Sequence, residues 1–116
     1  MSVINGSTQV HLKRTHTITD GSVLALTTFS IGDGTNTFDT IGNKLQDGTT
    51  SVNDRNDYQT RFNISTSEVA TLIINKVTER EEAVYQCSLA TSSGTWSYRI
   101  RVIVTGQLLL ITLSNV

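Results

Sequence analysis

Apolar and polar residues alternate most regularly in the second half of the chain. The alternation covers 61–65 and, after a Ser-Thr-Ser segment, 69–74, and it extends over the whole of 96–105. Successive side chains of a β-strand point to opposite faces, so a period of two is typical of strands with one buried face. We therefore expect 61–65 and 69–74 to form a hairpin and 96–105 to form a long strand.

The first half of the chain carries a weaker pattern. Residues 7–19 alternate weakly, which predicts a first strand near a sheet edge, whereas 22–29 is strongly apolar. The register of 22–29 stays open, because either its odd-numbered or its even-numbered residues can face the core. Short strands are expected at 37–41 and 44–46, and the polar segment 49–60 is interpreted as a weak edge strand with loops or as a mobile surface. Turns are predicted where Gly, Asn and Asp residues gather, at Asp20-Gly21, 32–36, Gly42-Asn43 and Asp47-Gly48.

Residues 81–87, with the sequence Glu-Glu-Ala-Val-Tyr-Gln-Cys, combine a tight turn with the start of a buried strand. Tyr85 and Cys87 are two residues apart and would lie on the same face of that strand. A turn at 92–95 then leads into 96–105. The segments together number seven to nine short strands without a convincing helix, which predicts an all-β sandwich of two sheets.

The length of 116 residues fits one compact domain. We expect this domain to cover 1–106. The apolar tail at 107–116 is too short to span a bilayer and is interpreted as a linker or as the start of a following domain. The net charge of -1, from nine basic and ten acidic residues, argues against binding to nucleic acid or to an anionic membrane surface.

The reactive residue types do not form a catalytic or metal-binding pattern. Cys87 is the only cysteine, so no disulfide can form within the chain, and we expect it to be a buried structural thiol. His11 and His16 are five residues apart and would face opposite sides of a strand, which disfavours joint metal ligation. The acidic turn at 79–82 and the polar segment at 53–57 are interpreted as solvated turns, with Ca²⁺ binding at 53–57 a weaker alternative. No enzymatic activity, cofactor or metal is expected.

Two N-glycosylation sequons are present, at Asn5-Gly6-Ser7 and Asn63-Ile64-Ser65. Such triplets are frequent in a chain rich in Ser, Thr and Asn. They mildly favour an extracellular location, with Asn5 and Asn63 as the acceptor residues.

Around its 81–87 segment the chain resembles the immunoglobulin superfamily, and within it the variable-type (V-set) domain. The motif Glu81-x-Ala83-x-Tyr85-x-Cys87 is similar to the D-x-A-x-Y-x-C of the family, with Tyr85 as the tyrosine-corner residue. Arg61 stands where the family places the partner of an acidic residue, here Glu81, in an ion pair across the bottom of the sandwich. The resemblance covers about residues 7 to 105 and implies a Greek-key fold.

Two departures from the family pattern concern the core. The first cysteine of the family is expected near Thr27 or Thr28, where the chain has none, so the bridge between the sheets cannot form. The family tryptophan is replaced by Phe38, or else the strand is shifted. Losing such a bridge costs about 2–5 kcal/mol, so the core must be well packed without it.

The resemblance also implies an interaction face on the sheet that contains the last strands. Tyr, Trp and Arg side chains are enriched at protein interfaces. The residues expected to contribute to this face are Trp96, Tyr98, Arg99, Arg101 and Lys44. The alternative for Trp96 is packing onto its own domain.

The resulting functional hypothesis is an extracellular recognition or adhesion domain, part of the ectodomain of a plasma-membrane receptor. Its partner would be a protein, preferably an identical or related V-set domain, in homophilic cell–cell recognition of the type known among invertebrate allorecognition receptors. A homodimer would fit this role, and the domain itself would not contact the membrane. The alternatives are an immune-type receptor that binds a foreign ligand through loops 32–36, 49–57 and 91–96, and a structural module of a larger chain.

Overall fold

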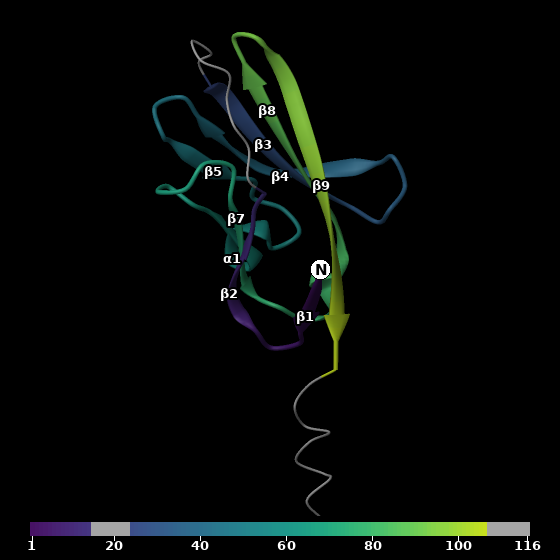
Figure 1. Cartoon of the computed structure of the whole chain (residues 1–116). Helices are drawn as coiled ribbons and strands as arrows, with labels where there is room; N and C mark the ends of the chain where they lie inside the picture. Colours follow the sequence, from purple (N-terminus) through teal and green to yellow (C-terminus); the bar gives the residue numbers. More distant parts are fainter. Residues whose placement is uncertain (15–23, 107–116) are drawn as a thin grey trace, which may run out of the picture.

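The computed structural model describes residues 1–14 and 24–106, which form two β-sheets packed face to face (Figure 1). The larger sheet has six strands in the order β1-β9-β8-β3-β4-β5, and the smaller has three in the order β2-β7-β6. The bounds in the larger sheet are β1 (Ser2–Ile4), β9 (Gly94–Thr105), β8 (Ala83–Thr91), β3 (Leu24–Gly32), β4 (Phe38–Leu45) and β5 (Thr50–Val52). Those in the smaller sheet are β2 (Thr8–Leu12), β7 (Leu72–Lys76) and β6 (Phe62–Ile64).

Two short helical turns complete the described chain, α1 (Tyr58–Arg61) and η1 (Glu79–Glu81). The prediction of an all-β sandwich with seven to nine strands is confirmed, since the described residues contain nine. Several expectations lie outside the described residues: the Asp20-Gly21 turn, the first residues of 22–29, His16 and the tail at 107–116.

The strands of the second half form where the alternation predicts them. β6 and β7 pair as an antiparallel hairpin, and Phe62 and Ile64 point into the core with 1 % and 2 % of their surface exposed. β9 runs the full length of the sheet and pairs with β8 without a break in register (Figure 1). These segments have one apolar face, which fixes their register against the core.

The first half departs from its expected boundaries at two places. The predicted turn at Gly42-Asn43 is wrong, because β4 continues through both residues. A Cβ atom on Gly42 would lie 2.2 Å from the carbonyl oxygen of Ser51, so the glycine allows β5 to approach closely. The short strand β1, which pairs parallel to the end of β9, was not predicted. The Asp47-Gly48 turn is present, with Gly48 at a φ of 93°.

β3 follows the odd-numbered register from Thr27, since Thr27 and Phe29 are buried with 1 % and 2 % exposure. A register shift between Leu24 and Leu26 reverses the faces before it, so Leu24 packs against the core and Ala25 is exposed. β3 pairs with β8, so both strands belong to the same sheet. Neither Thr27 nor Thr28 can therefore occupy the position of a cysteine that links the two sheets, and that expectation is wrong. Phe29 lies directly beside Cys87 in the pairing of β3 with β8.

The centre of the core lies between β2 and β8. Leu12 of β2 and Cys87 of β8 line one small cavity of about 10 Å³ between the two sheets. Phe29 lines the same cavity, whereas Phe38 lies at the start of β4 and is only partly buried. The replacement of the family tryptophan by Phe38 is therefore wrong, and the alternative of a shifted strand is right. Phe29 packs against the thiol where the tryptophan would.

Candidate functional site

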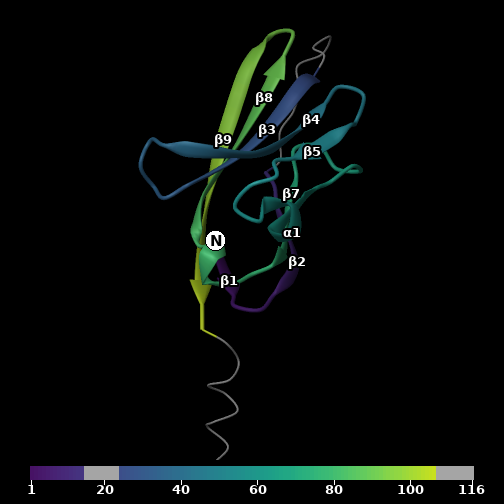
Figure 2. The same ribbon diagram turned by 180° about the vertical axis from the view of Figure 1, so that it is seen from behind.

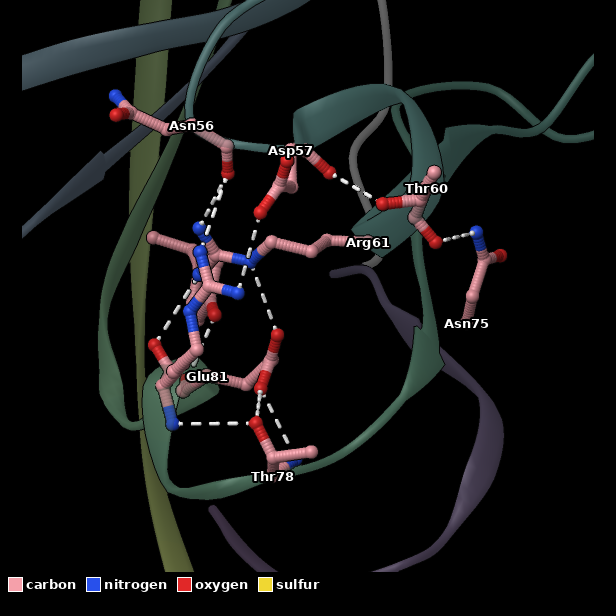
Figure 3. A network of polar contacts seen from close by, with 9 residues as sticks. Asn56, Asp57, Thr60, Arg61, Asn75, Thr78 and Glu81 are labelled. Atoms are coloured by element: carbon pink, nitrogen blue, oxygen red, sulfur yellow. Dashed lines mark hydrogen bonds and ion pairs between the residues drawn. The ribbon is translucent and has the colours of Figure 1, made fainter.

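The polar network at one end of the sandwich holds η1 against α1 (Figure 3). Arg61 donates from Nε to Glu81 Oε1 at 3.1 Å and from Nη1 to the carbonyl oxygen of Asn56 at 3.1 Å. The side chain of Glu81 also accepts from the backbone N–H of Thr78, which closes a capping box. The ion pair expected between Arg61 and Glu81 is therefore present.

Tyr85 completes the network from inside the core. Its hydroxyl donates to the carbonyl oxygen of Glu81 at 2.6 Å, as expected of a tyrosine corner. Burial, followed by the negative charge of Glu81, raises the pKa of Tyr85 well above its usual range. Each of these groups has a hydrogen-bond partner within the domain, so the network holds η1, α1 and β8 together.

Cys87 is a free thiol with only 2 % of its surface exposed. Burial raises its pKa to about 11, so the thiolate that a nucleophile requires is scarce at neutral pH. The expectation of a structural thiol agrees with this environment.

The outer face of the six-stranded sheet is the surface on which the sequence placed the interface residues. The alternation of β9 directs Arg99 and Arg101 onto this face, because Ile100 and Val102 between them are buried. Small polar side chains lie on the same face in one row across four strands: Ser97 of β9, Ser88 of β8, Thr28 of β3 and Asn43 of β4. We call this surface, from β9 to β5, the outer sheet face.

The centre of the outer sheet face is an arginine stacked on an aromatic ring. The guanidinium of Arg99 lies 4.8 Å from the centroid of the Phe38 ring, and its Nε donates to Gln86 Oε1 at 2.9 Å. A Cβ on Gly32 would lie 2.9 Å from the Phe38 ring, so the ring lies directly on the β3 backbone. Arg101 belongs to the adjacent row, and one of its terminal nitrogens lies 3.3 Å from where a Cβ on Gly34 would be.

This arrangement forms a cation–π pair that is held in place before any partner binds. Sequence reasoning assigned Phe38 to the core and missed its stacking with Arg99. The two residues are far apart along the chain and lie on strands that are not direct neighbours, so only the register of four strands brings them together.

Two of the expected interface residues face the other way. Trp96 and Tyr98 share the alternation of Ile100 and therefore lie on the inner face of β9. The Tyr98 hydroxyl donates to the carbonyl oxygen of Ala70 at 2.6 Å, which ties β9 to the smaller sheet. The expectation of one face shared by Trp96, Tyr98, Arg99 and Arg101 is therefore wrong, and the arginines alone reach the outer sheet face.

Lys44 also points away from the outer sheet face. It pairs in register with the buried Thr27, and its ammonium donates to three carbonyl oxygens of the β6–β7 loop. The distances are 3.0 Å to Ser65, 3.3 Å to Thr66 and 3.3 Å to Glu68. The assignment of Lys44 to the interface is therefore wrong, because its ammonium group holds the β6–β7 loop against β4 through these hydrogen bonds.

The candidate metal ligands have partners of other kinds. His11 Nδ1 lies 3.1 Å from Glu68 Oε1 on the surface of the smaller sheet. In the 53–57 segment, Asn53 donates to the carbonyl oxygen of Thr40, and Arg55 pairs with Asp39 at 2.6 Å. Within 1–14 and 24–106, no group of three or more His, Cys, Asp or Glu side chains could hold a metal ion.

Of the loops expected to bind a foreign ligand, 32–36 and 49–57 line one depression, whereas 91–96 lies at the opposite end of the sheet. The 32–36 loop joins β3 and β4 and projects from the side of the sandwich (Figure 2). It lies beside Val84 at the start of β8, whereas the turn after Thr91 lies beside Leu24, at the opposite end of the same strands. An open depression of about 540 Å³ separates the 32–36 loop from Arg55 and Tyr58.

The two sequons differ in accessibility. Asn63 is exposed on β6, an edge strand of the smaller sheet, whereas Asn5 is half-buried in the turn after β1. Both lie away from the centre of the outer sheet face, because Asn63 belongs to the other sheet and Asn5 follows the last pair of β1 with β9.

Comparison with known proteins identifies the fold. No protein-family model matches the chain, and no curated protein matches its sequence. Murine CRIg superposes with a TM-score of 0.69 at 18 % identity, over 90 % of this chain and 92 % of that chain. The extracellular portion of mouse CD200RLa superposes with a TM-score of 0.67 at 19 % identity, over 91 % of this chain. The match spans about half of that CD200RLa chain, 55 %.

Both superpositions cover at least 90 % of this chain. The described fold is therefore an immunoglobulin-like β-sandwich, as expected from the 81–87 motif. In the part of the chain that the structure describes, no helix is long and apolar enough to cross a membrane.

Proposed function

We propose that this chain is a variable-type immunoglobulin-like recognition domain of an extracellular receptor, and that it binds another protein through the outer sheet face. Strands β4 and β5 support the variable type, because they extend the sheet beyond β3 in the manner of the two additional strands of that class. The similarity of the fold to extracellular portions of receptors supports the location.

The observation that carries the proposal is the stack of Arg99 on Phe38. An arginine oriented by an aromatic ring and by Gln86 loses little conformational entropy when a partner binds. Arginine and aromatic residues are also the types that dominate the binding energy of interfaces. Small side chains lie on one side of the stack, at Ser88 and Ser97, whereas Phe38 lines the open depression on the other side.

The preferred partner is an identical or related domain on an apposed cell, with the two outer sheet faces in contact. A glycan on Asn63 would be compatible with this mode, because Asn63 lies on the smaller sheet. The domain would act by binding and not by catalysis, since its buried thiol and its ion pairs serve the fold.

Binding of beads coated with the domain tests the proposal. We expect Arg99→Ala and Phe38→Ala each to weaken bead aggregation about tenfold or more, as for central interface residues. Lys76→Ala is the matched control, because it removes a basic side chain from an exposed position on the smaller sheet.

Circular dichroism must show that each variant remains folded. Equal aggregation by Arg99→Ala and by the unmodified protein would refute the role of the outer sheet face. A domain that never aggregates but binds cells of its own source through Arg99 would support a heterophilic partner instead.

A further inference from the structure

No strand of the described chain pairs with the edge of β9 between the hairpin turn and β1. β1 covers only the last residues of β9, from Ile103 to Thr105. On this free side the odd-numbered residues present their backbone groups, as the contacts of the Arg99, Arg101 and Thr105 carbonyls indicate. Among the described residues, no hydrogen-bond partner is present for the N–H groups of Ser97 and Arg99.

Two carbonyl oxygens of the edge accept hydrogen bonds from charged groups, which a second copy would have to displace. The terminal amine of Met1 donates to Arg101 at 2.9 Å, and the Arg14 guanidinium donates to Arg99 at 3.0 Å. Natural proteins protect exposed edges with proline, lysine or a bulge. The 95–101 segment has no proline, no lysine and no break in its register with β8.

We propose that two copies of this chain pair through this edge, antiparallel, with a two-fold axis at Tyr98. The six-stranded sheets of both copies then join into one continuous sheet. Ser97 of each copy lies opposite Arg99 of the other, and Thr95 lies opposite Arg101. Each pair of edge-facing residues exchanges backbone hydrogen bonds across the axis, as in any antiparallel ladder.

The charges of β9 exclude the registers nearer β1, and an axis at Ser97 would pair three edge-facing residues of β9 in each copy instead of four. An axis at Arg99 would place the two Arg99 side chains opposite each other, and an axis at Ile100 would place Arg99 opposite Arg101. Like charges directly opposite each other destabilise a strand pair. An axis at Tyr98 places every arginine opposite a serine or threonine. It also ends the pairing at residue 101, just before β1 occupies the edge.

This lateral contact is separate from the proposed function, because it uses the edge of the sheet and leaves the outer sheet face open. The two-fold axis is perpendicular to the sheet, so both stacks of Arg99 on Phe38 face the same side. Such a pair would present two copies of the recognition surface to one partner and increase avidity without a new contact.

Sedimentation equilibrium of the full chain tests the edge pairing. Ser97→Glu places a carboxylate opposite Arg99 of the second copy, and Ser97→Arg places a second cation there. The axis repeats each contact, so we expect the dimer Kd to fall about two- to thirtyfold for Ser97→Glu and to rise by a similar factor for Ser97→Arg. Ser97 is exposed, so both variants are expected to fold normally.

Ser88→Glu and Ser88→Arg are the matched controls. Ser88 lies beside Ser97 on the same face but one strand away from the edge. We expect these variants to leave the dimer Kd unchanged, and we expect the amide protons of Ser97 and Arg99 to gain exchange protection as the protein concentration increases.

Equal shifts from the Ser88 and Ser97 variants, without that protection, would overturn the edge pairing in favour of contact through the outer sheet face. A strictly monomeric protein at millimolar concentration would also overturn it. A strictly monomeric protein would also count against the identical partner in the proposed function. Equal shifts from the Ser88 and Ser97 variants would overturn the edge pairing alone, so the two proposals can fail separately.

Discussion

Replacing Leu12 with cysteine is expected to join the two sheets through a new disulfide to Cys87. The two side chains line one cavity of about 10 Å³, and they are almost fully buried, at 3 % and 2 % exposure. The sequence has no other cysteine that could compete for the bridge. The substitution therefore places a second thiol where the two sheets already meet.

The expected stabilisation follows from the length of the loop that the bridge closes. A loop of about 75 residues corresponds to about 4.5 kcal/mol in the chain-entropy relation. The exchange of Leu12 for a smaller side chain removes about two buried methylene equivalents, at a cost of about 1.6 kcal/mol. The net gain of about 3 kcal/mol corresponds to a rise in Tm of about 12 °C, at about 4 °C per kcal/mol for a domain of this size.

Thiol titration and thermal unfolding followed by circular dichroism measure both effects. The oxidised Leu12→Cys protein should show no free thiol, and reduction should lower its Tm below that of the unmodified protein. Thr27→Cys is the control, because β3 lies in the same sheet as Cys87 and cannot supply a bridge between sheets. Two free thiols in oxidised Leu12→Cys, in a protein that remains folded, would refute the opposition of β2 and β8 at this point.

Three further variants or conditions test the contacts that replace the bridge. Tyr85→Phe leaves the buried carbonyl of Glu81 without its donor and should lower the free energy of unfolding by about 1–3 kcal/mol in urea titration; no change would refute the tyrosine corner. Lys44→Met should cost about 1–2 kcal/mol and speed hydrogen exchange in the β6–β7 loop, whereas Lys76→Met should change neither. The raised pKa of Cys87, about 11 against 9.0 for the free group, means that the unfolded chain loses this proton first as pH rises. The contribution of Cys87 to stability is therefore expected to be constant below about pH 9 and to fall between about pH 9 and 11, and Cys87→Ala should remove that contribution.

The sequence predicts best those strands whose apolar face packs against the core. The β6–β7 hairpin and the length of β9 follow from alternation alone, because the period of two also sets their register. The contacts of the 81–87 segment were also predicted, namely the ion pair of Glu81 with Arg61 and the hydrogen bond of the Tyr85 hydroxyl. They depend only on this short stretch of chain and one distant partner, Arg61.

The assignment of strands to sheets could not be obtained in the same way. β2 is a weakly apolar edge strand, and β3 is strongly apolar. The residue opposite Cys87 was expected on β3, whereas it is Leu12 of β2. Alternation says which side chains share a face and says nothing about which sheet a strand joins. Gly42 shows a second limit, because its role depends on the approach of β5, which no local pattern encodes.

The outer sheet face was predicted in part. The arginines of β9 were placed on it, and the same alternation, followed back from Ile100, could have placed Trp96 and Tyr98 on the inner face. The stacking of Phe38 with Arg99 required knowledge of the register across four strands. Such a contact is outside the reach of any periodicity in a single segment.

The unbridged thiol also determines how the domain responds to a pulling force. In a bridged sandwich, the chain between the two cysteines cannot lengthen when the ends are pulled apart. Here the chain between Leu12 and Cys87 has no such restraint, and about 75 residues at about 3.4 Å each would contribute about 250 Å of extension once the sheets separate. The domain could therefore lengthen under load by far more than a bridged sandwich, and Leu12→Cys would remove most of that extension.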